Sequence, residues 1–423
     1  MAGDLINCEI PDHWELTTLG DVCQRGGGSI QTGPFGSQLH ASDYVPVGIP
    51  SIMPTNIGDN RIVEEGIVRI TEQDANRLGQ HRLRAGDIVY SRRGDVEKRA
   101  LIREREEGWL CGTGCLKVRL GSGVVDPLFA SMFLGHPAIR EWIVRHAVGA
   151  TMPNLNTSIM STVPFALPPI AEQKAIAAVL GTLDDKIELN RRMNATLEAM
   201  ARALFQSWFV DFDPVRAKLD GRQPAGLDRA TAALFPDSFQ DSTLGTIPHG
   251  WRAVHLEAIA SVGSGKRPEG RSDVLSPECN IPLYGGGGRI GYVTSALYDQ
   301  PILLTGRVGT LGLIFRTAEP SWPSDNTLIV EPQPGLLDFT YFLLKGFDLL
   351  TLNRGSTQPL LTQADLKRQA LVLPAKDVVK AFTDVSEPIF RKISSNERES
   401  CTLATLRDSL LPKLLSGELH INE

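Results

Sequence analysis

The stretch LPPIAEQKAIAAVLGTLDDKIELNRRMNATLEAMARALFQSWFVDF, residues 167–212, decides how this chain is organised. After Pro169 it contains no proline and one glycine, Gly181, so its composition favours an unbroken helix. Apolar residues and two asparagines recur in it at alternating steps of four and three, the spacing of a coiled-coil seam. The seam consists of Ile176, Leu180, Leu183, Ile187, Asn190, Asn194, Leu197, Ala201, Leu204 and Trp208. The stretch therefore predicts one long helix whose seam faces another helix.

A second stripe of the same kind covers residues 377–416. Its seam positions are Phe382, Val385, Ile389, Ile393, Asn396, Leu403, Leu410 and Leu414. A helix of this length spans roughly 60 Å, which exceeds the width of a small domain, so part of each stripe needs a second long helix as its partner. We predict an antiparallel coiled coil in which Asn190 and Asn396 fix the register. The alternative is that each stripe packs on its own neighbouring domain as an ordinary amphipathic helix.

The chain also repeats itself. GATMPNLNTSIMSTVPFALPP from Gly149 aligns with GSTQPLLTQADLKRQALVLPA from Gly355, and each aligned pair is 206 residues apart. The same offset matches the two seams, with Asn190 aligned to Asn396. A shorter echo opens each half, as IPDHWELTTLGDV from Ile10 and IPHGWRAVHLEAI from Ile247. The sequence thus predicts a tandem duplication with variable interiors.

Each half begins with a region rich in glycine, proline and β-branched residues, in which short apolar runs such as GDIVYS and PILLTG are bounded by turn residues. The expected fold class is therefore α+β, with one mainly β domain and one long helix in each half. We expect the first β domain at 1–168, its helix at 169–212, a polar surface connector at 213–247, the second β domain at 248–374, and the second helix with a tail at 375–423.

The composition argues against several kinds of function. The six cysteines are too few for a disulfide framework, and CGTGC at 111–115 has no nearby histidine or second pair to complete a zinc site. ASVGSGKRP at 260–268 lacks the first glycine and the final Ser or Thr of a P-loop, and GGGG at 285–288 lacks the spacing of a dinucleotide loop. We therefore predict no catalytic residue, metal or cofactor, although a dispersed Ser-His-acid triad stays open. Without a leader or a long apolar run, we expect a cytoplasmic protein.

The net charge of the chain is -6, so the protein is not basic all over, but two of its segments carry more basic than acidic side chains. Residues 77–105 hold nine basic and four acidic side chains, and residues 252–316 hold seven basic and five acidic ones. A local excess of positive charge favours contact with phosphates. The simpler explanation of such runs is a solvated charged surface.

The sequence resembles a known family along most of its length. The segment from Leu167 to Lys218 is similar to the central region of the specificity (S) subunits of type I restriction-modification enzymes. GPFGSQL and DYVPVGIPSI in the first half, ILLTGRVGTLG in the second half, and LRDSLLPKLLSGEL near the end are similar to the same family.

The resemblance implies a protein with pseudo-twofold symmetry, in which each β domain is a target-recognition domain that reads one half of a bipartite site in double-stranded DNA, while the helices set the spacer. It also implies a non-catalytic subunit on which two methyltransferase (M) subunits and motor-nuclease (R) subunits assemble. S-adenosylmethionine, ATP and Mg²⁺ are then expected in those partners. Two alternatives stay open: a protein-binding scaffold that never contacts DNA, and a divergent enzyme with an unrecognised site.

Candidate DNA contacts are basic or neutral hydrogen-bonding residues beside predicted turns, because arginine reads guanine and binds phosphate while glutamine, serine and threonine bond to bases. They are Gln31, Ser37, Gln38, Arg92, Arg93, Lys98 and Arg99 in the first half, and Lys266, Arg267, Arg289, Arg307, Thr357 and Gln358 in the second. The aromatic residues Phe205, Trp208 and Phe209 are expected to be exposed and available to partner subunits.

Overall fold

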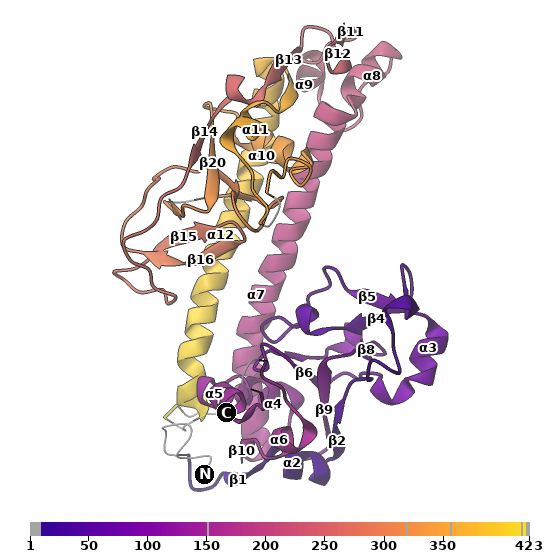
Figure 1. Ribbon diagram of the computed structural model, residues 1–423, viewed down its shortest axis with the longest axis vertical. Coiled ribbons are helices and arrows are strands. Elements are labelled where there is room, and N and C mark those ends of the chain that lie inside the picture. The colour runs from indigo at the N-terminus through magenta and orange to yellow at the C-terminus, as the bar shows by residue number, and fades with distance from the viewer. Residues whose placement is uncertain (1–9, 150–151, 319, 356–357, 416–417, 420–423) are drawn as a thin grey trace. The chain divides into compact units, whose positions relative to one another are not determined.

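The computed structural model describes residues 10–149, 152–318, 320–355, 358–415 and 418–419 (Figure 1). The chain forms two compact units. The first unit is Met1–Glu188 together with Glu399–Glu423, and the second unit is Leu189–Arg398. The second unit is therefore inserted into the sequence of the first, and each unit combines a β domain with segments of two long helices.

The strands of the first unit are β1 (Glu15–Thr18), β2 (Gly27–Thr32), β3 (Tyr44–Val45), β4 (Ile49–Ile52), β5 (Val68–Ile70), β6 (Ile88–Ser91), β7 (Arg99–Leu101), β8 (Leu110–Cys111), β9 (Cys115–Gly121) and β10 (Pro164–Leu167). They form an antiparallel sheet in the order β2-β9-β6-β7, a mixed sheet in the order β3-β5-β4-β8, and the pair β1-β10. Strand β6 is buried on both faces, because Ile88 and Tyr90 join one apolar core and Val89 joins another. This explains its continuous apolar sequence.

The strands of the second unit are β11 (Phe239–Ser242), β12 (Gly245–Pro248), β13 (Arg252–His255), β14 (Ala260–Ser264), β15 (Ile281–Gly285), β16 (Gly288–Val293), β17 (Leu303–Gly306), β18 (Ile314–Arg316), β19 (Trp322–Pro323), β20 (Thr327–Pro332) and β21 (Ala370–Leu373). The sheet β14-β20-β17-β18 repeats β2-β9-β6-β7, the sheet β16-β15-β19 repeats β5-β4-β8, and the pair β13-β21 repeats β1-β10. The parallel pair of β4 and β8 in the first unit also has a counterpart, the parallel pair of β15 and β19. The two β domains therefore share one topology.

Short helices complete the units. They are α2 (Leu19–Arg25), α3 (Glu72–Arg77), α4 (Pro127–Phe133), α5 (Pro137–His146) and α6 (Thr157–Ser161) in the first unit, and α8 (Asp213–Leu219), α9 (Arg229–Ala233), α10 (Leu337–Gly346) and α11 (Gln363–Lys367) in the second. Several begin at a side-chain cap, as when Asp126 Oδ1 accepts the backbone N–H groups of the first turn of α4. Single 3₁₀ turns occur at η1 (Ala41–Asp43), η2 (Pro54–Asn56), η3 (Gly79–His81), η4 (Glu104–Glu106) and η6 (Leu256–Ala258).

The region expected to be a surface connector contains α8, α9 and the hairpin β11-β12. Val215, Phe235 and Ile247 from this region are buried in the core of the second unit. Their burial was hidden from the sequence pattern because the three apolar residues come from separate short elements and share no period.

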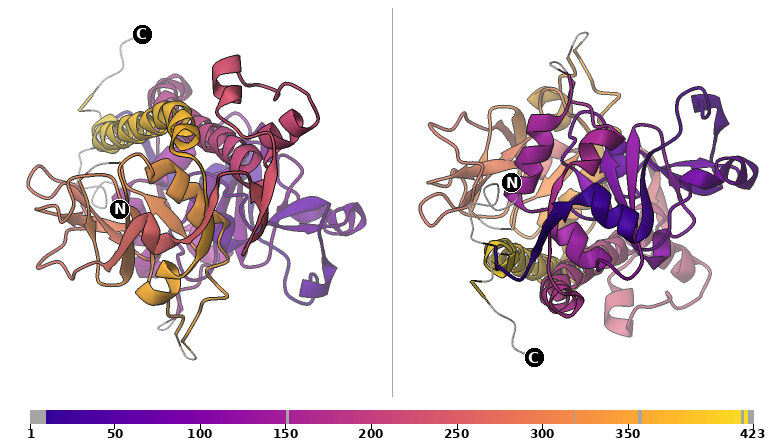
Figure 2. Two further views of the ribbon diagram at one scale, coloured as in Figure 1. Left: turned by 90° about the horizontal axis from the view of Figure 1, so that it is seen from above. Right: turned by 90° about the horizontal axis from the view of Figure 1, so that it is seen from below.

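The two long helices are α7 (Ile170–Phe205), extended by a π-helical turn at η5 (Gln206–Val210), and α12 (Lys376–Leu415). Both run through both units, and their paired segments can be followed in Figure 1 and, from above, in Figure 2. In the first unit, Asp184 of α7 binds Arg407 of α12 over 2.7 Å. In the second unit, Asn190 Nδ2 donates to the Asn396 carbonyl over 3.4 Å. Further along α7, Asn194 Nδ2 donates to the carbonyl of Ile393, which comes earlier on α12, over 3.3 Å, so the pairing in the second unit is antiparallel.

Parts of the two apolar stripes pack on the β domains, as the alternative interpretation expects. Ile176 and Leu180 lie in the main core of the first unit, and Phe382 lies in that of the second. Among the remaining seam positions, Ile187, Asn190 and Asn396 are buried, whereas Leu183, Leu197, Ile389, Ile393, Leu403 and Leu410 are half-buried. Val385 is 46% exposed. Along their length, the two helices therefore contact each other at some positions and their β domains at others.

The expectation that Phe205, Trp208 and Phe209 are exposed is wrong. Their exposed fractions are 6%, 3% and 7%, and they join the core of the second unit. Phe205 packs against Phe339 with the rings tilted and their centroids 5.6 Å apart, and Phe209 packs edge-to-face against the same ring at 5.1 Å. Their periodicity shows only that one helix face is apolar, and the fold supplies its cover from α10 and α12.

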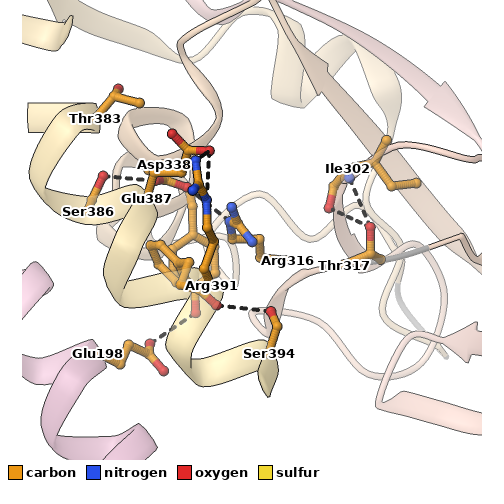
Figure 3. A network of polar contacts seen from close by, with 12 residues as sticks. Glu198, Ile302, Arg316, Thr317, Asp338, Thr383, Ser386, Glu387, Arg391 and Ser394 are labelled. Atoms are coloured by element: carbon orange, nitrogen blue, oxygen red, sulfur yellow. Dashed lines mark hydrogen bonds and ion pairs between the residues drawn. The ribbon is translucent and has the colours of Figure 1, made fainter. Parts of the chain in front are cut away.

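A buried polar network ties α10 to α12 in the second unit (Figure 3). Arg316 Nε donates to Asp338 Oδ1 over 3.0 Å, and Ser386 Oγ donates to Asp338 Oδ2 over 2.8 Å. The Arg316 guanidinium also lies 4.4 Å from the centre of the Phe390 ring. Each charge in this contact therefore has a partner, as burial requires.

Candidate nucleic-acid interface

In the first unit, the central strand β6 ends in a loop that carries Arg92 and Arg93. The Arg92 carbonyl accepts the Leu155 N–H over 2.9 Å, and Gly94 N–H donates to the Pro153 carbonyl over 3.2 Å. Gly94 has φ +74°, a left-handed conformation that favours glycine. These bonds fix the backbone of the loop and leave Arg93 exposed and Arg92 half-buried.

The second unit builds the same loop at the end of β17. The Arg307 carbonyl accepts the Leu361 N–H over 2.9 Å, and Gly309 N–H donates to the Pro359 carbonyl over 3.0 Å. Gly309 has φ +82°. Arg307 therefore occupies the position of Arg92, although the two are not aligned at the 206-residue offset of the repeat.

The partner of each loop is a tight turn at the repeated glycine, Gly149 or Gly355. A Cβ atom on Gly149 would overlap the Met152 carbonyl, and one on Gly355 would overlap the Gln358 carbonyl. The chain can make this turn only with glycine, which explains the first residue of the repeat. Gln358 is exposed on the turn, and Thr357 lies outside the described residues.

The turn of the second unit is held by an ion pair. Arg354 donates to Asp365 Oδ1 over 2.7 Å. The hydrogen bond from Arg354 and a second one from Thr362 lower the pKa of the Asp365 carboxyl below its usual value. The turn is thus anchored to the start of α11, where Asp365 lies.

A second loop meets the Arg92 loop in the first unit. It follows β2 and contains Phe35, Ser37 and Gln38. The Arg92 guanidinium lies 5.9 Å from the centre of the Phe35 ring, and the Gln38 side chain accepts the Phe35 N–H over 3.1 Å. Ser37 is exposed, whereas Gln31, on β2 itself, is half-buried. The structure therefore brings Gln38 and Arg92 together around Phe35.

In the second unit, Lys266 and Arg267 follow β14 as Phe35 follows β2, and both are exposed. Trp322 Nε1 donates to the Lys266 carbonyl over 2.8 Å. The glycine turn at 285–288 lies against Gly306, because a Cβ on Gly286 would stand 3.0 Å from the Gly306 Cα. That turn leads to Arg289, whose guanidinium lies 5.2 Å from the Tyr292 ring centre.

Arg99 is the one described candidate that is buried. Its exposed fraction is 7%, and its Nε donates to the Ser131 carbonyl over 2.7 Å. It cannot reach DNA from this position, so its prediction as a DNA contact is wrong. Its neighbour Lys98 is exposed and pairs with Asp95 over 2.6 Å.

Sequence reasoning missed Phe35, which is 58% exposed beside Arg92. An exposed aromatic ring next to an arginine can stack on a nucleotide base. The signal was present, because Phe35 stands between Pro34 and Gly36 in the turn-forming sequence GPFG.

The described residues contain no cluster of His, Cys, Asp and Glu that could hold a metal ion. Within the same residues, no helix is long and apolar enough to cross a membrane. The arrangement found in both units, exposed cations and amides on glycine-braced loops, suits binding rather than bond-making chemistry.

The sequence is also similar to known proteins. Residues 11–199 match the family model described as type I restriction modification DNA specificity domain. The type I restriction enzyme MjaIX specificity subunit of Methanocaldococcus jannaschii is 23% identical, over 98% of this chain and 95% of that protein. The HindI specificity subunit of Haemophilus influenzae is 25% identical, over 88% of this chain and 95% of that protein.

A solved structure shares the fold. The crystal structure of the S subunit of a type I restriction-modification system from M. genitalium aligns with a TM-score of 0.55 and 18% identity, over 95% of this chain and 96% of that one. Residues 11–199 are therefore similar to the type I restriction modification DNA specificity domain, and the chain over most of its length is similar to the specificity subunits of type I restriction enzymes.

Proposed function

We propose that this chain reads a bipartite sequence in double-stranded DNA, with the β domain of each unit contacting one half-site. The observation that carries the proposal is the shared position of Arg92 and Arg307. Each follows the central strand of its sheet, and the backbone carbonyl of each accepts the amide of the matching repeat residue, Leu155 or Leu361. Two equivalent arginines suit two equivalent half-sites.

The surrounding loops supply the rest of the proposed contact. In the first unit, Arg93, Lys98, Ser37 and Gln38 surround the Arg92 loop, and in the second unit Lys266, Arg267, Arg289 and Gln358 have the corresponding role. The cations would hold the DNA backbone, while arginine and the neutral side chains would read base edges. Different loop sequences on one topology would then give different half-sites.

The helices α7 and α12 would set the unread spacer and dock two methyltransferase subunits, with motor-nuclease subunits joining the full complex. This chain would be non-catalytic and cytoplasmic. S-adenosylmethionine, ATP and Mg²⁺ would belong to the partner subunits, in keeping with the sequence, which shows no P-loop or other cofactor motif.

An exchange of β domains tests the half-site assignment. Residues from Ile10 to Pro168 would be replaced by the matching domain of a relative, and methylated sites would be mapped in cells that express the complete system. We expect one half of the methylated motif to change and the other to stay. A change in both halves would contradict independent reading.

A binding assay separates this proposal from a protein-only scaffold. The assembled complex should bind duplex DNA with an affinity that falls steeply as salt rises, because cations on the protein displace counterions from the phosphates. Binding that is absent, or insensitive to salt, would favour the scaffold.

A further inference from the structure

The loops around Arg92 and Arg307 differ in chemistry at two matching positions. In the first unit, two large apolar side chains are exposed beside the Arg92 loop, Phe35 by 58% and Met152 by 61%. In the second unit, the exposed polar residues Arg267 and Gln358 stand in the corresponding places. The two units therefore present different chemical groups on the same backbone framework.

Phe35 and Arg267 follow equivalent strand ends. Gly33 after β2 and Gly265 after β14 each donate a backbone N–H to the carbonyl of the first residue of the neighbouring strand, β9 or β20, over 2.9 and 3.2 Å. A Cβ atom on either glycine would overlap a backbone carbonyl. Phe35 and Arg267 are each the second residue after this glycine, so an apolar ring and a cation begin from the same place.

Met152 and Gln358 occupy the same place in the glycine turns. Each is the third residue after the repeated glycine, Gly149 or Gly355, and its carbonyl is the group that a Cβ on that glycine would overlap. The next residue in each turn is a proline, whose carbonyl accepts an N–H from the arginine loop of its unit over 3.2 or 3.0 Å. Met152 therefore lies directly beside the Arg92 loop.

The backbone holds the Phe35 ring at the surface. Pro34 before it and Leu39 after it are buried, and the Gln38 N–H donates to the Phe35 carbonyl over 2.8 Å. The Arg92 guanidinium lies 5.9 Å from the ring centre. An exposed apolar group that is fixed in place beside a cation is typical of a surface that a binding partner covers.

Duplex DNA offers one apolar group to such a surface. The flat faces of the bases are covered by neighbouring pairs, so a protein side chain meets the base edges in the grooves. In the major groove, these edges carry hydrogen-bond donors and acceptors together with the C5-methyl group of thymine. Phenylalanine contacts this methyl group, and the flexible side chain of methionine adapts to irregular apolar surfaces.

Given that the two loops read DNA, as proposed above, we infer that Phe35 and Met152 recognise thymine in the first half-site by contact with its 5-methyl group. Arg267 and Gln358 recognise the second half-site through hydrogen bonds, since arginine and glutamine bind the polar edges of guanine and adenine. The two half-sites are thus read by different kinds of contact, although the two β domains share one topology.

Replacement of thymine by uracil in the DNA tests the methyl contact, because uracil lacks only the 5-methyl group and pairs with adenine in the same way. The domain exchange described above identifies the first half-site. The assembled complex would then be titrated with duplexes in which the thymines of its site are replaced one at a time. At one or two positions of the first half-site, we expect affinity to fall about fourfold, which corresponds to the burial of one methyl-sized group. Replacements in the second half-site should change affinity by less than about twofold.

Variants show which side chain makes each contact. In Phe35→Ala or Met152→Ala, a position that is sensitive to uracil in the parent should become insensitive. Phe35→Arg and Met152→Gln copy the residues of the second unit and should have the same effect. All four changes are at exposed side chains, so the variants should fold. Leu244→Ala is the control, because Leu244 is an apolar residue, 42% exposed, in the turn between β11 and β12 and outside both arginine loops. This variant should keep the sensitivity of the parent.

Three results would overturn the inference: tolerance of uracil throughout the first half-site, equal sensitivity in the second half-site, or sensitivity that persists in both alanine variants. Salt-dependent binding of duplex DNA in the same titrations would show that the proposed function still holds in these cases. A complex that does not bind duplex DNA in a salt-dependent way would contradict both the inference and the proposed function.

Discussion

Asn190 donates its side-chain Nδ2–H to the carbonyl of Asn396 over 3.4 Å, and the two residues stand 206 positions apart, the period of the sequence repeat. Asn396 also donates to Asn194 Oδ1 over 2.7 Å. Both Asn190 and Asn396 are almost fully buried. Each asparagine of the repeat therefore contacts its own counterpart, which gives the paired helix segments of the second unit a defined register.

We expect Asn190→Ala to lower the free energy of unfolding by about 1–3 kcal/mol, because it removes the hydrogen bond to the Asn396 carbonyl and leaves a void in a buried contact between the helices. Asn190→Leu combined with Asn396→Leu should cost less than the two single changes together, since it replaces both polar partners by apolar ones. Denaturant unfolding of the three variants measures this coupling. Strictly additive effects would show that the pair does not act as a unit.

The proposed spacer role of the helices predicts the effect of one extra heptad after Asn190 and another after Asn396, with the seam kept in phase. Each helix would lengthen by about 10 Å, which corresponds to at most about three base pairs. Three pairs also rotate the second half-site by about 100°, so we expect a gain of roughly one to three pairs with weaker binding. Mapping of methylated sites decides this, and an unchanged spacer would contradict the prediction.

The equivalence of Arg92 and Arg307 predicts matched effects on DNA binding. Arg92→Ala and Arg307→Ala should each weaken binding, and each lost phosphate contact should reduce the slope of log affinity against log salt by about 1. If an arginine reads a base instead, the loss is about 1–3 kcal/mol and one position of the corresponding half-site becomes degenerate. Lys380→Ala, an exposed lysine outside both loops, is the control. Normal binding by both arginine variants would remove these loops from the interface.

The buried ion pair of the second unit predicts a large effect on stability. Asp338→Ala should lower the free energy of unfolding by about 3–5 kcal/mol, because it leaves the charge of Arg316 buried without a partner. Replacement of both residues by apolar ones of similar size should cost far less. The matched control is the exposed pair Lys380–Asp384, whose removal should change stability by less than about 1 kcal/mol. Equal losses at the two pairs would contradict this account.

Two buried histidines predict how the first unit responds to acid. Burial lowers the pKa of His81 and of His136, and the charge of Lys117 lowers that of His81 further. The folded unit thus binds fewer protons than the unfolded chain, whose imidazoles titrate near a pH of about 6.5. Their stabilisation is complete above that pH and is lost as the pH falls from it through the lower folded values. Unfolding measured between about pH 7.5 and pH 5 should show this loss in the parent and a smaller one in His81→Gln combined with His136→Gln.

The parts of the fold that the sequence predicts are those that repeat locally. Seam positions such as Ile176 and Leu180 recur at a short period, and a 206-residue offset aligns Asn190 with Asn396, so both patterns are visible without coordinates. A local pattern does not show which residues cover an apolar helix face. Trp208 belongs to the seam as Ile176 does, yet only the fold shows that Phe235, α10 and α12 cover its end of the helix.

The candidate nucleic-acid interface shows the same contrast between local sequence patterns and contacts made by residues far apart in the chain. Arg92 and Arg99 belong to one basic run, and the sequence offers no reason to separate them. The difference arises from residues far away in the chain, because Leu155 fixes the Arg92 loop at the surface whereas Ser131 and Gly135 enclose Arg99. The equivalence of Arg92 and Arg307 was hidden for a related reason, since the loops between the strands differ in length and break the repeat offset.

The discontinuity of the first unit has a consequence for synthesis. Its main core, which contains Ile176 and Leu180, also contains Leu411, Leu414 and Leu415 from the end of α12. The ribosome makes all of the second unit, Leu189–Arg398, before it makes these leucines. Because domains fold as units once their residues are available, the half of the chain that is translated later completes its core first. The half that is translated first must wait, with part of its apolar surface uncovered, for the last turns of α12.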